Sequence, residues 1–145
     1  VIQGAGPDAL GAAGGGLGYA GLPNSVAVKF DLVDNAGEGA DTTGLYVNGA
    51  EPTVPAEAST VPLHSGHVFT VRATYDGRGL SVVLEDPVTG AYHVGWYPVD
   101  LAAAVGGTHA YVGFTAGTGE LFAPIDVLDW KYASTDNWDT TTIHL

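Results

Sequence analysis

The chain has 145 residues, of which 46% are apolar and 14% charged, and its formal net charge is −12. This length suits a single domain, and so large an acidic excess excludes proteins that bind phosphate backbones through Lys and Arg. No apolar run is long enough to span a membrane. Cations and neutral ligands such as sugars are the partners compatible with this composition.

The chain contains neither cysteine nor methionine. Without cysteine it has no disulfide framework. A sequence that begins at Val1 and lacks methionine is expected to be a processed product or an excised segment, and removal of a signal peptide would fit. We therefore expect a secreted protein, located outside the cell or at its surface.

The first half of the chain predicts short strands joined by long loops. Apolar side chains alternate with Ala27, Lys29 and Asp31, which predicts a half-buried strand. Three prolines follow later and exclude a central strand there. Strands are expected over 1–4, 26–31 and 44–49, with a Gly/Ala-rich loop over 5–24 and a surface loop over 50–66.

The second half predicts further strands at close spacing. The sequence Asp76-Gly77-Arg78-Gly79 predicts a hairpin turn between two strands with clean alternation. The alternation predicts a core face made of Phe69, Val71, Ala73, Tyr75, Leu80, Val82 and Leu84. Strands are expected over 67–75, from 80 to 84, 91–97, 109–115 and 125–133, and 99–105 fits either a strand or a helical turn. About eight short strands at this spacing predict an all-β sandwich.

Two loops in the first half carry chemistry. The loop after the strand at 26–31 is rich in oxygen ligands: Asp31, Asp34, Asn35, Glu38 and Asp41. Hard cations such as calcium take several carboxylate, amide and backbone oxygens at once. The segment 14–18, GGGLG, lets its backbone approach another surface closely.

A third motif completes a family resemblance. Residues 111–119, YVGFTAGTG, followed by 125–130, IDVLDW, resemble the last two strands of a legume-type (L-type) lectin domain. The resemblance implies a concanavalin-like jelly-roll β-sandwich of two antiparallel sheets that binds glycans and is not an enzyme. The chain is similar to bacterial members of the family. The resembling domain covers residues 1–133 and lacks the family's early strands, and residues 134–145 form a polar tail.

The resemblance also implies a metal-binding loop, but this sequence departs from the family's metal-ligand pattern at two positions. Calcium would be held by Asp31, Asn35, Asp41 and the backbone carbonyl of Val33. The family's second, transition-metal site would be lost, because Lys29 replaces a glutamate and Thr42 a histidine. We expect Lys29 to supply its own charge there and to pair with Asp31, leaving Glu38 as a spare carboxylate. The alternative is a solvated acidic loop without metal.

The sugar site implied by the resemblance is incomplete. Asn35 matches, Gly15 or Gly16 would offer a backbone amide, and Gly119, at the end of the 111–119 turn, is a further candidate sugar contact. Val33 stands where the family has an aromatic platform, and the family's aspartate would lie before Val1. Carbohydrate recognition is the leading function even so.

Enzymatic alternatives find little support. A glycosidase needs two facing carboxylates, but Glu85 and Asp86 are adjacent and point to opposite faces of a strand. His64 and His67 flank a turn without a carboxylate at ligand spacing, so we expect both to be exposed. Trp96 and Trp130 are expected in the core.

Missing early strands suggest a second function. Unpaired strand edges promote association, so a neighbouring copy or another chain would supply the absent strands. The Thr-rich tail 134–145 has β-propensity and is a candidate donated strand. The alternative to a lectin is therefore a structural subunit of a self-assembling extracellular fibre or surface layer.

Overall fold

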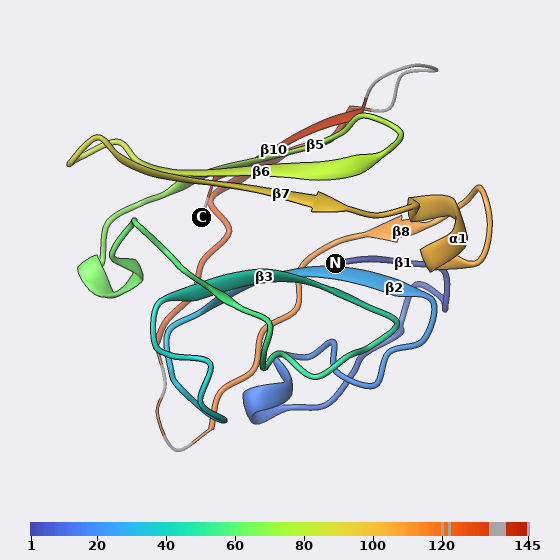
Figure 1. Cartoon of the computed structure of the whole chain (residues 1–145), viewed down its shortest axis with the longest axis horizontal. Helices are drawn as coiled ribbons and strands as arrows, with labels where there is room; N and C mark the ends of the chain where they lie inside the picture. Colours follow the sequence, from blue (N-terminus) through green and yellow to red (C-terminus); the bar gives the residue numbers. More distant parts are fainter. Residues whose placement is uncertain (120, 122, 134–138, 145) are drawn as a thin grey trace. The chain divides into compact units, whose positions relative to one another are not determined.

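The computed structural model describes residues 1–119, 121, 123–133 and 139–144, the last of these by backbone alone. The chain forms two compact units, each built around one antiparallel sheet (Figure 1). The first unit comprises Val1–Ala58 and Leu101–Pro124, and the second comprises Ser59–Asp100 and Ile125–Leu145. No helix in the described part of the chain is long and apolar enough to cross a membrane.

The first unit contains a five-stranded sheet in the order β4-β3-β2-β1-β8. Its two long strands, β2 and β3, pair from Val26 opposite Val47 to Asp31 opposite Thr42. The loop between them is therefore anchored at both ends. The strands are β1 (Ile2–Gln3), β2 (Ser25–Asp31), β3 (Thr42–Val47), β4 (Glu57–Ala58) and β8 (Tyr111–Val112), and the unit also holds a 3-10 turn η1 (Gly14–Gly16) and a short helix α1 (Leu101–Val105).

Strand β2 is covered on both faces, and its polar face is the more deeply buried. Lys29 and Asp31 are 2% and 3% exposed, whereas Val28 and Phe30 are partly exposed. The loop over 50–55 covers the polar face, since the Tyr46 hydroxyl donates to the Thr53 and Pro55 carbonyls. The alternation predicted a strand correctly but did not predict which face would be enclosed.

An aromatic cluster closes the core of the first unit. The rings of Tyr19 and Tyr46 lie with centroids 6.0 Å apart, and Ala27 packs with them. Val1 and Leu17 lie against this cluster at its partly buried margin. The Gly/Ala-rich segment over 5–24 is therefore a packed part of the unit, which fixes the position of the glycine turn at η1.

The second unit contains a five-stranded sheet in the order β7-β6-β5-β10-β9 (Figure 1). The hairpin turn predicted at 76–79 is present, and the Asp76 carboxylate accepts the amides of Arg78 and Gly79, both at 2.8 Å. The predicted inward face is confirmed for Phe69, Val71, Leu80, Val82 and Leu84, which are buried, while Ala73 and Tyr75 are partly buried. The strands are β5 (Thr70–Tyr75), β6 (Gly79–Asp86), β7 (Ala91–Pro98), β9 (Asp129–Lys131) and β10 (Asp139–His144), with a 3-10 turn η2 (Leu63–Ser65) before them.

Several predicted boundaries differ from those observed. The undecided segment 99–105 contains the helix α1, and the strands expected over 109–115 and 125–133 shorten to Tyr111–Val112 and Asp129–Lys131. Of the tail 134–145, residues 139–144 form β10, which pairs with β5 and β9 of the same chain. Residues 134–138 and 145 lie outside the described residues. The division into a domain over 1–133 and a donated tail stays a prediction.

The prediction that Trp96 and Trp130 lie in the core is wrong. Their exposed fractions are 55% and 42%. Both stand on edge strands of the second sheet, β7 and β9, where one flank has no neighbouring strand. The Trp96 ring lies over Gly79, because a Cβ at that glycine would come within 2.7 Å of Trp96 Cζ2. The absence of a side chain at Gly79 thus allows the indole ring to pack against the backbone.

Candidate functional site

The acidic loop, the glycine turn and residues 111–119 of the third motif meet in the first unit. The Asn35 side chain lies against the glycine turn, since a Cβ built on Gly15 would be 3.4 Å from Asn35 Cγ. The segment after β8 also contacts this turn, and the Thr115 hydroxyl donates to the Leu17 carbonyl at 2.9 Å. At Gly117 a Cβ would come within 2.3 Å of the Gly14 carbonyl oxygen, so only glycine permits this approach. We call these three segments together the loop cluster.

The glycines predicted for sugar binding occupy different environments. Gly15 is exposed beside Asn35. Gly16 is buried, its amide donates to the Ala13 carbonyl, and a Cβ would come within 2.8 Å of Ala12 Cβ. Gly119 is exposed with open space where a Cβ would lie. Gly16 therefore serves the packing of the turn, while Gly15 and Gly119 present backbone to solvent.

A buried ammonium lies under the acidic loop. The Lys29 side chain is fully buried, and its Nζ donates to the Pro52 carbonyl at 2.6 Å. The same Nζ lies 3.4 Å from Asp31 Oδ2, which agrees with the pairing expected from the sequence. It also lies 5.6 Å from the centroid of the Tyr46 ring, within the range of a cation–π contact.

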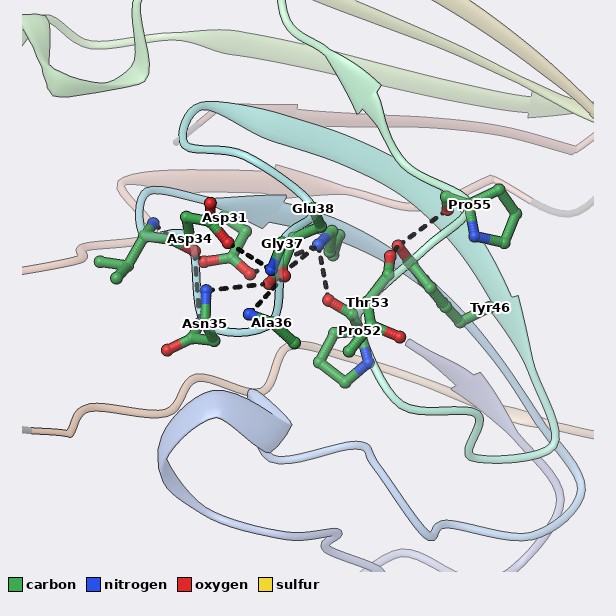
Figure 2. Close-up of polar contacts among 12 residues, drawn as sticks. Asp31, Asp34, Asn35, Ala36, Gly37, Glu38, Tyr46, Pro52, Thr53 and Pro55 are labelled. Atoms are coloured by element: carbon green, nitrogen blue, oxygen red, sulfur yellow. Dashed lines mark hydrogen bonds and ion pairs between the residues drawn. The ribbon is translucent and has the colours of Figure 1, made fainter.

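Glu38 is not a spare carboxylate, contrary to the prediction. Its side chain is fully buried, and Oε1 lies 3.9 Å from Lys29 Nζ. Oε1 accepts the amide of Asn35 at 3.3 Å, and Oε2 accepts the amide of Ala36 at 2.7 Å. Figure 2 shows the carboxylate of Glu38 turned back toward this backbone. An acid three residues after Asn35 was the only signal in the sequence, and it did not distinguish a clamp from a solvated charge.

The remaining loop groups bond to one another. Asp31 Oδ1 accepts the amide of Val33 at 3.2 Å, and the Asn35 Nδ2 donates to the Val33 carbonyl at 3.3 Å. Asp34 accepts the amide of Gly37 at 2.6 Å. Asp41 has a φ of 53° and precedes Thr42, the partner of Asp31 in the β2–β3 register. The two aspartates thus flank the base of the same loop.

The family resemblance implies two metals at this loop, and the residues present do not fit both of them. Among the described residues, no three His, Cys, Asp or Glu side chains come together so as to hold a metal ion. The transition-metal site does not fit, because the buried Lys29 ammonium lies beside Asp31 where a cation would be. Calcium at Asp31, Val33, Asn35 and Asp41 stays a prediction.

A second buried carboxylate, in the second unit, corrects the expectation for His67. His67 Nδ1 lies 2.8 Å from Asp86 Oδ2, and Asp86 is completely buried. The Thr89 hydroxyl and the Val88 amide also donate to this carboxylate, at 2.7 and 2.9 Å. Burial raises the pKa of Asp86, but these hydrogen bonds outweigh it and lower the pKa to about 2. His64 is exposed, as expected.

Comparison with known proteins identifies the family. The legume lectin domain family matches residues 14–144 of the chain, a span that includes the whole loop cluster. Comparisons with curated proteins and with solved structures gave no match. The family's fold is the jelly-roll β-sandwich, so the predicted fold class, all-β with two antiparallel sheets, is confirmed. The chain belongs to the legume lectin domain family.

Proposed function

We propose that this chain is a non-enzymatic carbohydrate-binding protein whose ligand contacts the loop cluster. Membership of the legume lectin domain family indicates a carbohydrate-binding, lectin-like function. The observation that carries the proposal for this chain is the position of the exposed Asn35 amide beside the exposed Gly15, where a Cβ would lie 3.4 Å from Asn35 Cγ. Gly119, also exposed, belongs to the segment that packs on the same glycine turn.

The chemistry of these groups suits a neutral sugar. The amide of Asn35 offers donors and an acceptor on one side chain, which matches the hydroxyl groups of a pyranose. A backbone amide at a glycine adds a donor without a side chain in the way. A chain with a net charge of −12 repels anionic ligands at long range, so neutral glycans are favoured over acidic ones.

A glycan array followed by calorimetry tests this proposal. Asn35→Asp keeps the shape of the side chain but removes the amide donors and adds a negative charge. We expect it to weaken binding by at least about tenfold, the effect of one lost hydrogen bond in a site.

Asn48→Asp is the matched control for this substitution. Asn48 is also exposed, and its Oδ1 accepts the Asn24 amide, a bond that aspartate preserves. Silence across neutral and acidic glycans, or equal effects of the two substitutions, would contradict the proposal.

We further propose that the protein acts outside the cell or at its surface, where domains of this family often act. Within the proposal, Lys29 takes the place of the family's transition metal. Both statements are tested directly, the first by protease access to the protein on intact cells. The second is tested by metal analysis of the purified chain, and one bound transition-metal ion per chain would contradict it.

A second candidate function is a structural subunit that associates with copies of itself. The edge strand β7 carries three large apolar side chains at alternate positions, and Tyr92, Val94 and Trp96 are all more than half exposed. A long apolar edge strand favours pairing with another chain. We expect light scattering to show concentration-dependent association that Val94→Lys abolishes and the control Val88→Lys, in the neighbouring turn, leaves intact. A monomer at all concentrations would end this alternative.

A further inference from the structure

We propose that the ligand-presenting loop of this protein is held by an internal ion cluster and not by any bound metal. The cluster consists of the Lys29 ammonium with the carboxylates of Asp31 and Glu38. Lys29 and Glu38 are positioning residues in this view, because they act on Asn35 through the loop backbone. The inference deepens the proposed function, whose ligand contacts Asn35.

The ammonium is provided with oxygen partners. It carries three donors, and the oxygens near it are the Pro52 carbonyl at 2.6 Å, Asp31 Oδ2 at 3.4 Å and Glu38 Oε1 at 3.9 Å. All of these groups belong to the first unit. A buried charge requires such compensation. Lys29 is therefore an integral cation of the loop.

The carboxylate of Glu38 connects the ammonium to the backbone at Asn35. Glu38 Oε1 lies 3.9 Å from Lys29 Nζ. Figure 2 shows both oxygens of Glu38 accepting amides of the loop backbone. The amides it accepts are those of Asn35 and Ala36. The position of Asn35 beside Gly15 therefore depends on an ion pair from Lys29 to Glu38 and on the hydrogen bonds from the loop amides to Glu38.

The same contacts oppose calcium. Calcium needs six to eight oxygen ligands with little competing positive charge nearby. Of the predicted ligands, Asp31 already receives Lys29 on one oxygen and the Val33 amide on the other, and the Val33 carbonyl accepts the Asn35 amide. An ion at Asp31 Oδ2 would lie within a few ångströms of a buried ammonium, where water does not screen the repulsion.

The test uses metal ions alone and needs no sugar. Thermal unfolding of the full chain is measured in excess EDTA, in calcium and in manganese. We expect the same Tm in all three solutions, since a cation that binds only the folded state would stabilise it by RT ln(1 + [L]/Kd) and raise the Tm. A rise of Tm that grows with the logarithm of the calcium concentration would overturn the inference and support calcium at the predicted ligands.

A charge-reversal variant tests whether removing the ammonium creates a need for a metal ion. Lys29→Glu places three carboxylates together without a counter-ion, and we expect its Tm in EDTA to fall by roughly 10 °C or more. A divalent cation should restore part of this loss, because the variant has the charge for one. The exposed Lys131→Glu is the matched control, with little loss and no rescue by metal.

Each outcome of these two measurements supports or overturns the inference. A Lys29→Glu variant that is as stable as the wild type in EDTA would overturn the inference. If the variant does not fold at all, the comparison of wild-type unfolding in EDTA and calcium still decides. Failure to find a glycan would contradict the proposed function but would leave this inference untouched, since neither measurement involves a ligand.

Discussion

Two connections in this protein bury a carboxylate and compensate its charge in different ways. One is the loop between β2 and β3, and the other is the turn between β6 and β7. Each buries a carboxylate, Glu38 in the first and Asp86 in the second, and each carboxylate accepts backbone amides. The loop compensates its charge with the permanent ammonium of Lys29. The turn uses the imidazole of His67 and the hydroxyl of Thr89.

The difference shows how much each element depends on charge. Two carboxylates, Asp31 and Glu38, lie near one ammonium, so removing the ammonium leaves uncompensated buried charge. Asp86 is one carboxylate with donors on both oxygens, and it needs no ammonium. The loop should therefore respond strongly to loss of its cation, and the turn should respond to acid.

The largest effect is expected from Lys29→Met, which keeps the length of the side chain and removes its charge. Leaving buried carboxylates without their partner should reduce the free energy of unfolding by about 3–5 kcal/mol, measured by urea denaturation. Adding Glu38→Gln should recover part of the loss, because it removes one of the stranded charges. Lys131→Met is the control, and a loss no greater than that of the control would break the comparison.

A smaller effect is expected at Asp86, and it is tied to pH. The folded pKa lies at about 2, below the usual 3.8, so the carboxylate stabilises the fold above about pH 4 and loses this contribution as pH falls toward 2. Urea midpoints between pH 2 and 5 should fall with acid in the wild type and fall less steeply in Asp86→Asn.

Glu85→Gln is the control for the acid response. Glu85 neighbours Asp86 on β6 but is exposed, so its substitution should leave the acid dependence unchanged. Equal slopes for Asp86→Asn and the wild type would show that the contacts with His67 and Thr89 contribute nothing to the acid response.

The smallest effect on stability is expected from Gly15→Ala. Its Cβ would lie 3.4 Å from Asn35 Cγ, a tight contact that the exposed side chain relieves by moving. Stability should change by less than about 1 kcal/mol, while the NMR signals of the Asn35 side-chain amide shift. Gly107→Ala, where a Cβ meets nothing within 4 Å, is the control. Unchanged Asn35 signals would contradict the contact between the glycine turn and the Asn35 side chain.

Strand patterns and motif order in the sequence predicted much of the fold. The alternation around Val71 and Leu84 predicted the inward face of the second sheet, and Asp76-Gly77 predicted its hairpin, because both depend on neighbours in sequence. The helix α1 was undecided, because five residues carry too little periodicity.

The site was predicted in outline but not in mechanism. The pairing of Lys29 with Asp31 was expected from the family resemblance, because Lys29 stands where the family has a glutamate of the metal site. The contact of Lys29 with the Pro52 carbonyl and that of His67 with Asp86 join segments distant in sequence, which no local pattern reveals. The bonds from Glu38 to the Asn35 and Ala36 amides are local, but the burial of Glu38 beside Lys29 depends on how the loop folds.

Amide hydrogen exchange at Val33 and Ala36 in EDTA tests the central claim most directly. These amides donate to Asp31 and Glu38, the two carboxylates of the ion cluster. We predict that both exchange more slowly than the exposed amide of Gly77, with rates unchanged by calcium. Unprotected exchange in EDTA that slows when calcium is added would show that a metal holds the loop.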